Sequence, residues 1–418
     1  MFAELFPDFM LPRLVLIGCL GMTAAQAGLA PIELTLVDGE AIGYAVFQSH
    51  NQKVVANAHG IFMTHLRTRN EAYTAQTWRL SRSTDGGKTF ETVYEATHAT
   101  NPPVLETDAA GTVYLARPDF EDGNAYLYRF LAEKDFQDPI MTVIPGAAAG
   151  KYSMSMDAAR GQLYFFAHNN TFNVIGLDGQ VRTPVTLLQQ GPNACLQYPL
   201  LSLAADGALH AAWTTQKHGV YLYWDIHHIV SPDGGQSWRA PGGATLTPPI
   251  VADDTGPAPR ITSDDEFEAH TWLASFLAKG GKLHFAYMAQ TTPPRMHYAR
   301  YDSATGAREV FLESQFRGDT LEVLSLDGFF ATRDGSPESP LYFVGSFQGR
   351  VVCLASTDNG TTWHDHAAAD AVYQPYSVGG CRTVTPDGCI IGSFTDQSGN
   401  NTIPDRQSRV YFFRIPAR

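Results

Sequence analysis

Three short strings along the chain share one pattern: serine, any residue, aspartate, any residue, glycine, any residue, threonine or serine, and then an aromatic residue. They occupy residues 83–90, 231–238 and 356–363. The aspartate carboxylate can accept backbone N–H groups of the residues that follow it, the glycine tolerates a positive φ, and the ring can fill space between neighbouring sheets. The pattern therefore predicts three hairpin turns with a structural role rather than a catalytic one.

A longer repeat surrounds these strings. Tight turns followed by strand-like apolar runs recur roughly every 50 residues, which is typical of repeat architectures. The turns are His59-Gly60, Ala110-Gly111, Arg160-Gly161, Asp206-Gly207, Gly280-Gly281, Asp334-Gly335 and Asp387-Gly388. Seven units of four strands predict an all-β fold, a seven-bladed β-propeller. The last strand-like run, residues 409–415, aligns with third strands, so we expect residues 32–37 to supply the missing outer strand and to close the ring.

The N-terminal residues predict export. Arg13, an apolar run over residues 14–22 and Ala25-Gln26-Ala27 match a secretory signal over residues 1–27. The sequence around Cys19 resembles a lipoprotein box, but the apolar run before it is short, which favours ordinary export. We therefore expect a secreted or periplasmic protein with one propeller domain over residues 28–418, and we find no later run long enough to span a membrane.

Charge and cysteine usage narrow the partners. The formal net charge is −13 and the basic residues form no stripe, which makes nucleic acid an unsuitable partner. Cys195, Cys353, Cys381 and Cys389 are too widely spaced for a zinc finger. Cys381 and Cys389 flank a turn and can either face each other or lie buried in blade cores. The sequence calls for no cofactor, leaves a structural divalent cation open, and is consistent with a monomer.

Candidate site residues follow from the architecture. In a propeller, the loops joining second to third strands and the beginnings of the innermost strands converge on one end of the axis, where ligands bind. Lys151, Gln197 and Tyr376 fall there. Arginine forks bind carboxylates, and histidine or tyrosine can move protons, so this end is suited to an acidic sugar. The predicted substrate-binding residues are Arg67, Arg69, Arg117, Arg295 and Arg382, and the predicted catalytic residues are His65, His168, His270, Tyr73 and Tyr198.

Each of these side chains also has a structural interpretation. Arg117 can simply pair with Asp119, His168 can cap a strand, His270 can be a buried hydrogen-bonded residue, and Tyr198 can belong to the core. These alternatives remain open from the sequence.

The three strings, the stretch from Tyr198 to Gly235 and the count of seven units resemble the Asp-box (BNR-repeat) propellers of the sialidase superfamily. The resemblance is greatest to BNR-repeat polysaccharide lyases, the group that includes ulvan lyases and rhamnose-glucuronate lyases. It implies β-elimination at a uronic acid within an acidic polysaccharide or oligosaccharide. A cation would neutralise the carboxylate, a histidine or tyrosine would remove the C5 proton, and a second such group would protonate the leaving oxygen.

Two other functions remain open. A sialidase-like exo-glycoside hydrolase would need an arginine triad, drawn from Arg67, Arg117, Arg295 and Arg382, and an acid such as Asp119. Seven units, where sialidases have six blades, and an Arg-Ile-Pro sequence at residues 414–416 instead of near the N-terminus argue against it. A non-catalytic glycan-binding propeller would not need several histidines near the axis.

Overall fold

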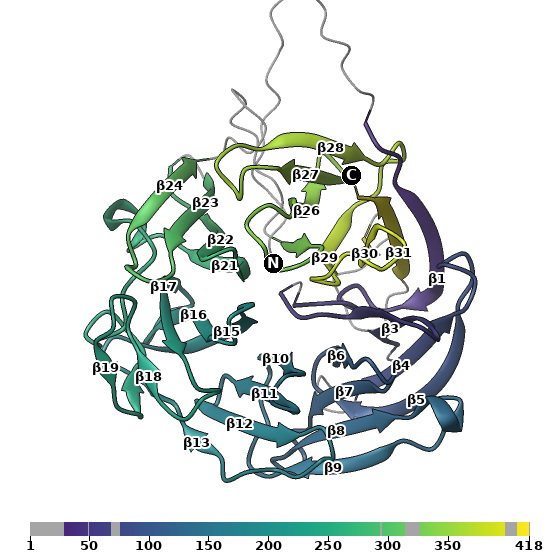
Figure 1. The fold of residues 1–418 in the computed structure, drawn as a ribbon, viewed down its shortest axis with the longest axis horizontal. Helices are drawn as coiled ribbons and strands as arrows, with labels where there is room; N and C mark the ends of the chain where they lie inside the picture. The colour runs from purple at the N-terminus through teal and green to yellow at the C-terminus, as the bar shows by residue number, and fades with distance from the viewer. Residues whose placement is uncertain are drawn as a thin grey trace, which may run out of the picture.

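The computed structural model describes residues 29–48, 50–67, 76–292, 295–313, 327–397 and 408–417. In these residues the chain forms seven antiparallel sheets, six of four strands and one of five, arranged as blades around a central axis (Figure 1). This arrangement confirms the predicted seven-bladed β-propeller. The expected signal segment, residues 1–27, lies outside the described residues.

The strands run outward from the axis within each blade. Blades 1 to 3 consist of β2 (Val54–Asn57), β3 (Gly60–Leu66), β4 (Gln76–Ser83) and β5 (Glu91–Ala99); β6 (Val104–Thr107), β7 (Val113–Pro118), β8 (Ala125–Phe130) and β9 (Ile140–Ile144); and β10 (Tyr152–Asp157), β11 (Gln162–Ala167), β12 (Thr171–Gly176) and β13 (Val185–Thr186). Blades 4 and 5 consist of β15 (Ala194–Leu203), β16 (Leu209–Lys217), β17 (Tyr223–Ser231), β18 (Trp238–Arg239) and β19 (Thr245–Leu246); and β21 (Thr271–Lys279), β22 (Lys282–Ala289), β23 (Arg295–Asp302) and β24 (Arg308–Glu313). Blades 6 and 7 consist of β25 (Gly328–Thr332), β26 (Leu341–Phe347), β27 (Arg350–Ser356) and β28 (His364–Ala368); and β29 (Pro375–Gly380), β30 (Cys389–Asp396), β31 (Ser408–Pro416) and β1 (Glu33–Ala41).

The remaining elements are short. Strands β14 (Leu188–Gln189) and β20 (Ile250–Val251) form a parallel pair, and two 3₁₀ helices cover Ala132–Lys134 and Asp264–Glu266. Neither helix in this described part of the chain has the length or apolar character needed to cross a lipid bilayer.

The two ends of the chain close the ring. Strand β1 pairs antiparallel with β31, with Glu33 opposite Arg414 and Leu36 opposite Tyr411. Figure 1 shows this pair as purple beside yellow, the first and last colours of the chain. The predicted outer strand is therefore confirmed, and it extends beyond the expected residues to Ala41. Closure by β1 leaves the last blade with no open edge beside β31.

The antiparallel connections separate the two ends of the axis. One end, called the turn end, carries the turns between first and second strands, and all seven predicted tight turns lie there. The three aspartate-containing strings follow third strands and share this end. The opposite end, called the loop end, carries the second-to-third-strand loops and the beginnings of the innermost strands.

The three strings form the expected turns. The Oδ1 atom of Asp85 accepts the backbone N–H groups of Lys88 and Thr89, both at 3.0 Å. The same contacts recur at 3.1 and 2.8 Å for Asp233 with Gln236 and Ser237, and at 2.9 and 2.8 Å for Asp358 with Thr361 and Thr362. Each carboxylate thus provides an acceptor for two backbone N–H groups of its own turn.

Each of these turns also docks on the preceding blade. Its aromatic residue packs against a ring on that blade's third strand: Phe90 on Phe412, Trp238 on Phe172 and Trp363 on Tyr298, with centroids 5.1, 5.3 and 5.1 Å apart. The glycine three positions before the aromatic residue faces the same ring. A Cβ at Gly235 would lie 2.3 Å from the ring of Phe172. The strings therefore join neighbouring blades, and glycine is required for the close approach.

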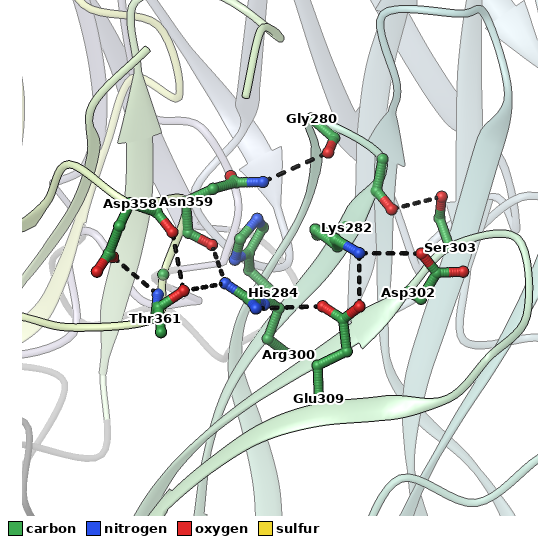
Figure 2. A network of polar contacts seen from close by, with 12 residues as sticks. Gly280, Lys282, His284, Arg300, Asp302, Ser303, Glu309, Asp358, Asn359 and Thr361 are labelled. Carbon is green, nitrogen blue, oxygen red and sulfur yellow. Dashed lines mark hydrogen bonds and ion pairs between the residues drawn. The ribbon is translucent and has the colours of Figure 1, made fainter. Parts of the chain in front are cut away.

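Polar contacts reinforce the docking between blades 5 and 6 (Figure 2). The Arg300 guanidinium on β23 donates to the carbonyl oxygen of Asn359 at 2.8 Å and to the hydroxyl of Thr361 at 2.7 Å. It also pairs with Glu309, which in turn accepts from Lys282. The side-chain amide of Asn359 donates to the carbonyl oxygen of Gly280 at 3.3 Å. This network is confined to the turn end and serves the ring rather than a ligand.

We expect Asp233→Ala to lower the free energy of unfolding by about 1–3 kcal/mol, because turn N–H groups lose their acceptor. Equilibrium denaturation measures the change, and Asp370→Ala, at an exposed aspartate, is the matched control. An unchanged midpoint together with lost activity would reverse the structural assignment of this string.

Candidate functional site

A cavity of about 230 Å³ lies at the loop end. Its walls come from blades 4, 5 and 7, from Asp327 just before blade 6, and from the segment that precedes blade 1. Its aromatic lining residues are Phe47, Tyr198, Tyr221, Tyr223, Trp272 and Tyr376, and its ionisable lining residues besides tyrosine are His50, His270 and Asp327. Such a cavity, with apolar rings and a few convergent polar groups, has the character of a binding site.

One wall is a crossing segment, residues 42–48 and 50–53, which lies between the outer strand β1 and the innermost strand β2. It passes over the loop end and is tied to blade 3, where the side-chain amide of Gln48 donates to the carbonyl oxygen of Gly150 at 2.6 Å. It presents Phe47, which stacks on Tyr376 at 6.3 Å, and His50, whose ring meets Tyr198 edge-on at 5.7 Å.

A chain of tyrosine hydroxyls runs along the opposite wall. The hydroxyl oxygen of Tyr223 lies 3.3 Å from that of Tyr198 and 3.1 Å from that of Tyr221. Tyr198 is on β15, and Tyr223 begins β17. Burial raises the pKa of both Tyr198 and Tyr223 above the ordinary value, so both hydroxyls are protonated near neutral pH. The three hydroxyls can pass protons along the wall.

His270 lies beside this chain with one tautomer fixed. Its Nδ1 atom accepts the backbone N–H of Tyr223 at 3.1 Å. A backbone N–H can only donate, so the proton of the neutral ring is on Nε2. The ring stacks on Tyr223 at 4.8 Å and meets Trp272 edge-on at 4.9 Å. Burial lowers the pKa of His270, which keeps the ring neutral and makes Nε2 a hydrogen-bond donor.

Lys151 brings a positive charge to the tyrosine wall. It precedes β10, donates to the side-chain oxygen of Gln197, and places Nζ 4.8 Å from the centroid of the Tyr198 ring and 5.8 Å from that of Tyr223. Within the described residues, no carboxylate lies at ion-pair distance from this ammonium group. Burial lowers the pKa of Lys151 to about 8, so the group remains mostly charged at pH 7. The site therefore holds a partly buried cation that lacks an acidic partner there.

Three of the residues predicted from the sequence lie together at this site. Tyr198 and His270 line the cavity, and His168 adjoins Lys151. The Nδ1 atom of His168 accepts the backbone N–H of Lys151 at 3.2 Å. Burial and the charge of Lys151 lower the pKa of His168 to about 4.

His65 and Arg67 do not line the cavity, so neither joins the other predicted residues there. Arg67 directly follows β3, and its side chain lies on the same side as that of His65, facing the neighbouring blade. The Nε2 atom of His65 lies 3.1 Å from Asp38, and Arg67 pairs with Asp38 at 3.6 Å and with Glu40, both on β1. Two carboxylates on the outer strand of blade 7 therefore hold these two side chains between the blades.

Arg117 and Arg295 are also outside the cavity. Arg117 is 7% exposed, and its guanidinium contacts Asp119 at 3.0 Å and the hydroxyl of Tyr128 at 3.1 Å. Arg295 pairs with Asp265 and Glu313 at 3.0 and 3.3 Å.

The position expected for Arg382 is wrong. This residue follows β29, in the turn between first and second strands, and therefore lies at the turn end. There it lines a separate axial cavity of about 890 Å³ and donates to the carbonyl oxygen of Met154 at 3.3 Å. The predicted residues Arg69 and Tyr73 lie outside the described residues.

Several site residues were not predicted. Tyr221 lies in the second-to-third-strand loop of blade 4, and Tyr223 begins the third strand directly after it. Two tyrosines next to a loop that the repeat places at the loop end could have been recognised as candidates from the sequence. Trp272 lies on β21, two positions after His270, so alternation along the strand predicts that the two side chains lie on the same face. Phe47 and His50 carried no such signal, because nothing in the sequence indicates that their segment crosses the axis.

The structure bears on two questions that the sequence left open: whether Cys381 and Cys389 form a disulfide, and whether a cation has a binding site. Cys381 and Cys389 are both buried and form no disulfide, which favours the core interpretation. One group in the described chain, His98, Asp119 and Glu121, could supply three ligands to a cation. The Arg117 guanidinium lies 3.0 Å from the Asp119 carboxylate, however, and its charge opposes a cation there.

Comparisons with known proteins show a shared fold. No protein-family model and no curated sequence matches the chain. A polysaccharide lyase of family PL25, an ulvan lyase bound to -[GlcA(1-4)Rha3S]-, is 11% identical over 90% of this chain and 94% of its own, with a TM-score of 0.60. A second structure of PL25 ulvan lyase has 12% identity, the same coverage and a TM-score of 0.59. The WD40 domain of coronin from Toxoplasma gondii is 11% identical over 94% of this chain and 88% of its own, with a TM-score of 0.51. The chain therefore shares its propeller arrangement with a polysaccharide lyase.

Proposed function

We propose that the protein is a carbohydrate-active enzyme that cleaves a uronic-acid-containing polysaccharide by β-elimination. The observation that carries this proposal is the position of the Lys151 ammonium group, 4.8 Å from the ring of Tyr198, with no acidic partner in the described residues. An anionic substrate group would supply the missing partner. β-Elimination needs a charge to neutralise the carboxylate and groups that move protons, and Tyr198, Tyr223 and His270 are beside Lys151.

The roles follow from the contacts. The substrate carboxylate binds near Lys151, whose charge makes the C5 proton more acidic. Tyr198 takes this proton while its own hydroxyl proton passes to Tyr223, 3.3 Å away, and the nearby ammonium group stabilises the negative charge that develops on Tyr198 during the transfer. The C5–H and C4–O bonds break, a C4–C5 double bond forms, and the leaving oxygen takes a proton from the Tyr223 hydroxyl. The fixed Nε2–H of His270 donates to the substrate and orients it.

The hydrolase alternative has less support. A sialidase-like hydrolase uses a tyrosine nucleophile and needs the arginine triad described above to hold the carboxylate of its substrate. None of the described residues that line the cavity is an arginine, and the one carboxylate there, Asp327, accepts the backbone N–H of Ser377 at 3.0 Å. The arginine triad is therefore missing from the described cavity.

The test is a screen of acidic polysaccharides with the purified protein, in which the ultraviolet absorbance of the unsaturated uronate is followed. We expect this chromophore to accumulate with at least one uronate-containing polymer. A saturated reducing-end product would identify a hydrolase, and saturable binding with no product would identify a glycan-binding propeller.

A further inference from the structure

Two exposed aromatic side chains lie at the loop end: Tyr221 lines the cavity, and Phe120 does not. Among the large hydrophobic side chains that are exposed in the described residues, Phe120 and Tyr221 are the aromatic ones, at 45% and 75% exposure. Both belong to second-to-third-strand loops, in blades 2 and 4, and so both lie at the loop end. The faces of sugar rings stack on exposed aromatic side chains, so both residues are suited to hold a saccharide at this end of the axis.

A continuous line of contacts connects Phe120 to the site. Gly150 lies between two rings, because a Cβ at this residue would be 3.6 Å from Phe120 and 3.7 Å from His168. Lys151 comes next in the chain, and its Nζ lies over the ring of Tyr198. The line therefore runs from blade 2 across blade 3 to the tyrosines of blade 4.

The charges along this line differ from one end to the other. Lys151 is the cation, and His168 is neutral with its proton on Nε2, since Nδ1 accepts the backbone N–H of Lys151. The residues after Phe120 are acidic. Glu121 lies 3.0 Å from His98 and is about half exposed, and the hydrogen bond from Tyr126 lowers the pKa of Asp122 and keeps that carboxylate charged. An anionic sugar is favoured beside Lys151 and disfavoured beside Phe120.

We propose that Phe120 and His168 form a second saccharide subsite that binds an uncharged sugar unit next to the acidic unit held by Lys151. The unit stacks on Phe120, and His168 Nε2–H donates to one of its hydroxyl oxygens. This inference rests on the proposed function for the identity of the acidic unit. It adds that the substrate has a neutral sugar next to its uronate.

The first test is Phe120→Ala, assayed on a polymer of alternating uronate and neutral sugar. We expect KM to rise about three- to tenfold, because the stacking contact is lost while the reacting groups remain. Met141→Ala is the matched control, since Met141 is 54% exposed on the outer strand of the same blade. An equal KM for the wild type and Phe120→Ala would overturn the subsite.

The second test compares ulvan, built of -[GlcA(1-4)Rha3S]- units, with the same polymer after removal of its sulfate groups. We expect tighter binding of the desulfated polymer, measured by calorimetry, and we expect Glu121→Gln to reduce this preference. A preference for the sulfated polymer would contradict the neutral subsite. Calorimetry needs no turnover, so a protein that binds both polymers without releasing unsaturated product would refute the proposed lyase while still testing the subsite.

Discussion

Replacing Lys151 with methionine is expected to lower kcat/KM for a uronate polymer by about 10²- to 10³-fold. The ammonium group is the one cation beside the Tyr198–Tyr223 hydroxyl pair in the described chain, and loss of one preorganised electrostatic partner has an effect of this size. Steady-state release of unsaturated product measures it. Lys134→Met, at an exposed lysine in a surface 3₁₀ helix, is the control and should leave the rate unchanged.

The pH profile provides a sharper form of this prediction. Burial lowers the pKa of Lys151 to about 8, and only the charged form neutralises a carboxylate. Activity of the wild type should therefore decline as pH rises through about 8. Lys151→Arg keeps its charge at every accessible pH, so the alkaline decline should move upward even if the maximal rate falls. An unshifted decline in Lys151→Arg would assign the titration to another group and remove Lys151 from this role.

The second large effect concerns acid stability. His210 and His228 lie in blade 4 with Nδ1 of His210 3.1 Å from Nε2 of His228, and both side chains are buried. Burial lowers the pKa of His210 to about 4 and that of His228 well below its ordinary value. The folded state therefore holds both rings neutral, whereas the unfolded chain binds protons below about pH 6.5. Their contribution to stability is complete above that pH and is lost as the pH falls toward 4.

For His210 alone, the difference corresponds to about 3 kcal/mol of unfolding free energy between pH 7 and pH 4. His210→Gln should reduce the change in unfolding free energy between pH 7 and pH 4 by roughly this amount, as measured by denaturant titration at each pH. His364→Gln, at an exposed histidine on β28, is the control. Identical pH dependence in the wild type and His210→Gln would show that the pair does not determine acid lability.

The seven-bladed ring could be predicted from the sequence more completely than the candidate site. The repeated glycine turns predicted the seven blades because each turn is local, as at Gly60 and Gly111, where φ is +136° and +86°. Tyr198 and His270 could also be predicted as site residues, since the repeat places the beginnings of the innermost strands at one end of the axis.

The arginines were predicted less well because their partners come from distant parts of the chain. Arg67 was predicted to bind the substrate, but the sequence could not reveal that Asp38 of β1 would lie against it. Lys151 shows the converse problem. Its importance depends on the lack of an acidic neighbour in the described fold, which no local pattern encodes.

The crossing segment, residues 42–48 and 50–53, connects the closure of the ring with the wall of the cavity. It continues from β1, which closes the ring, and it supplies Phe47 and His50 to the wall of the cavity. If β1 detaches from β31, this wall is pulled away as well, so a ligand held there binds the closed ring in preference to the opened one. By mass action, a bound saccharide should then stabilise the pairing of β1 with β31 and slow the hydrogen exchange of the backbone amides in β1.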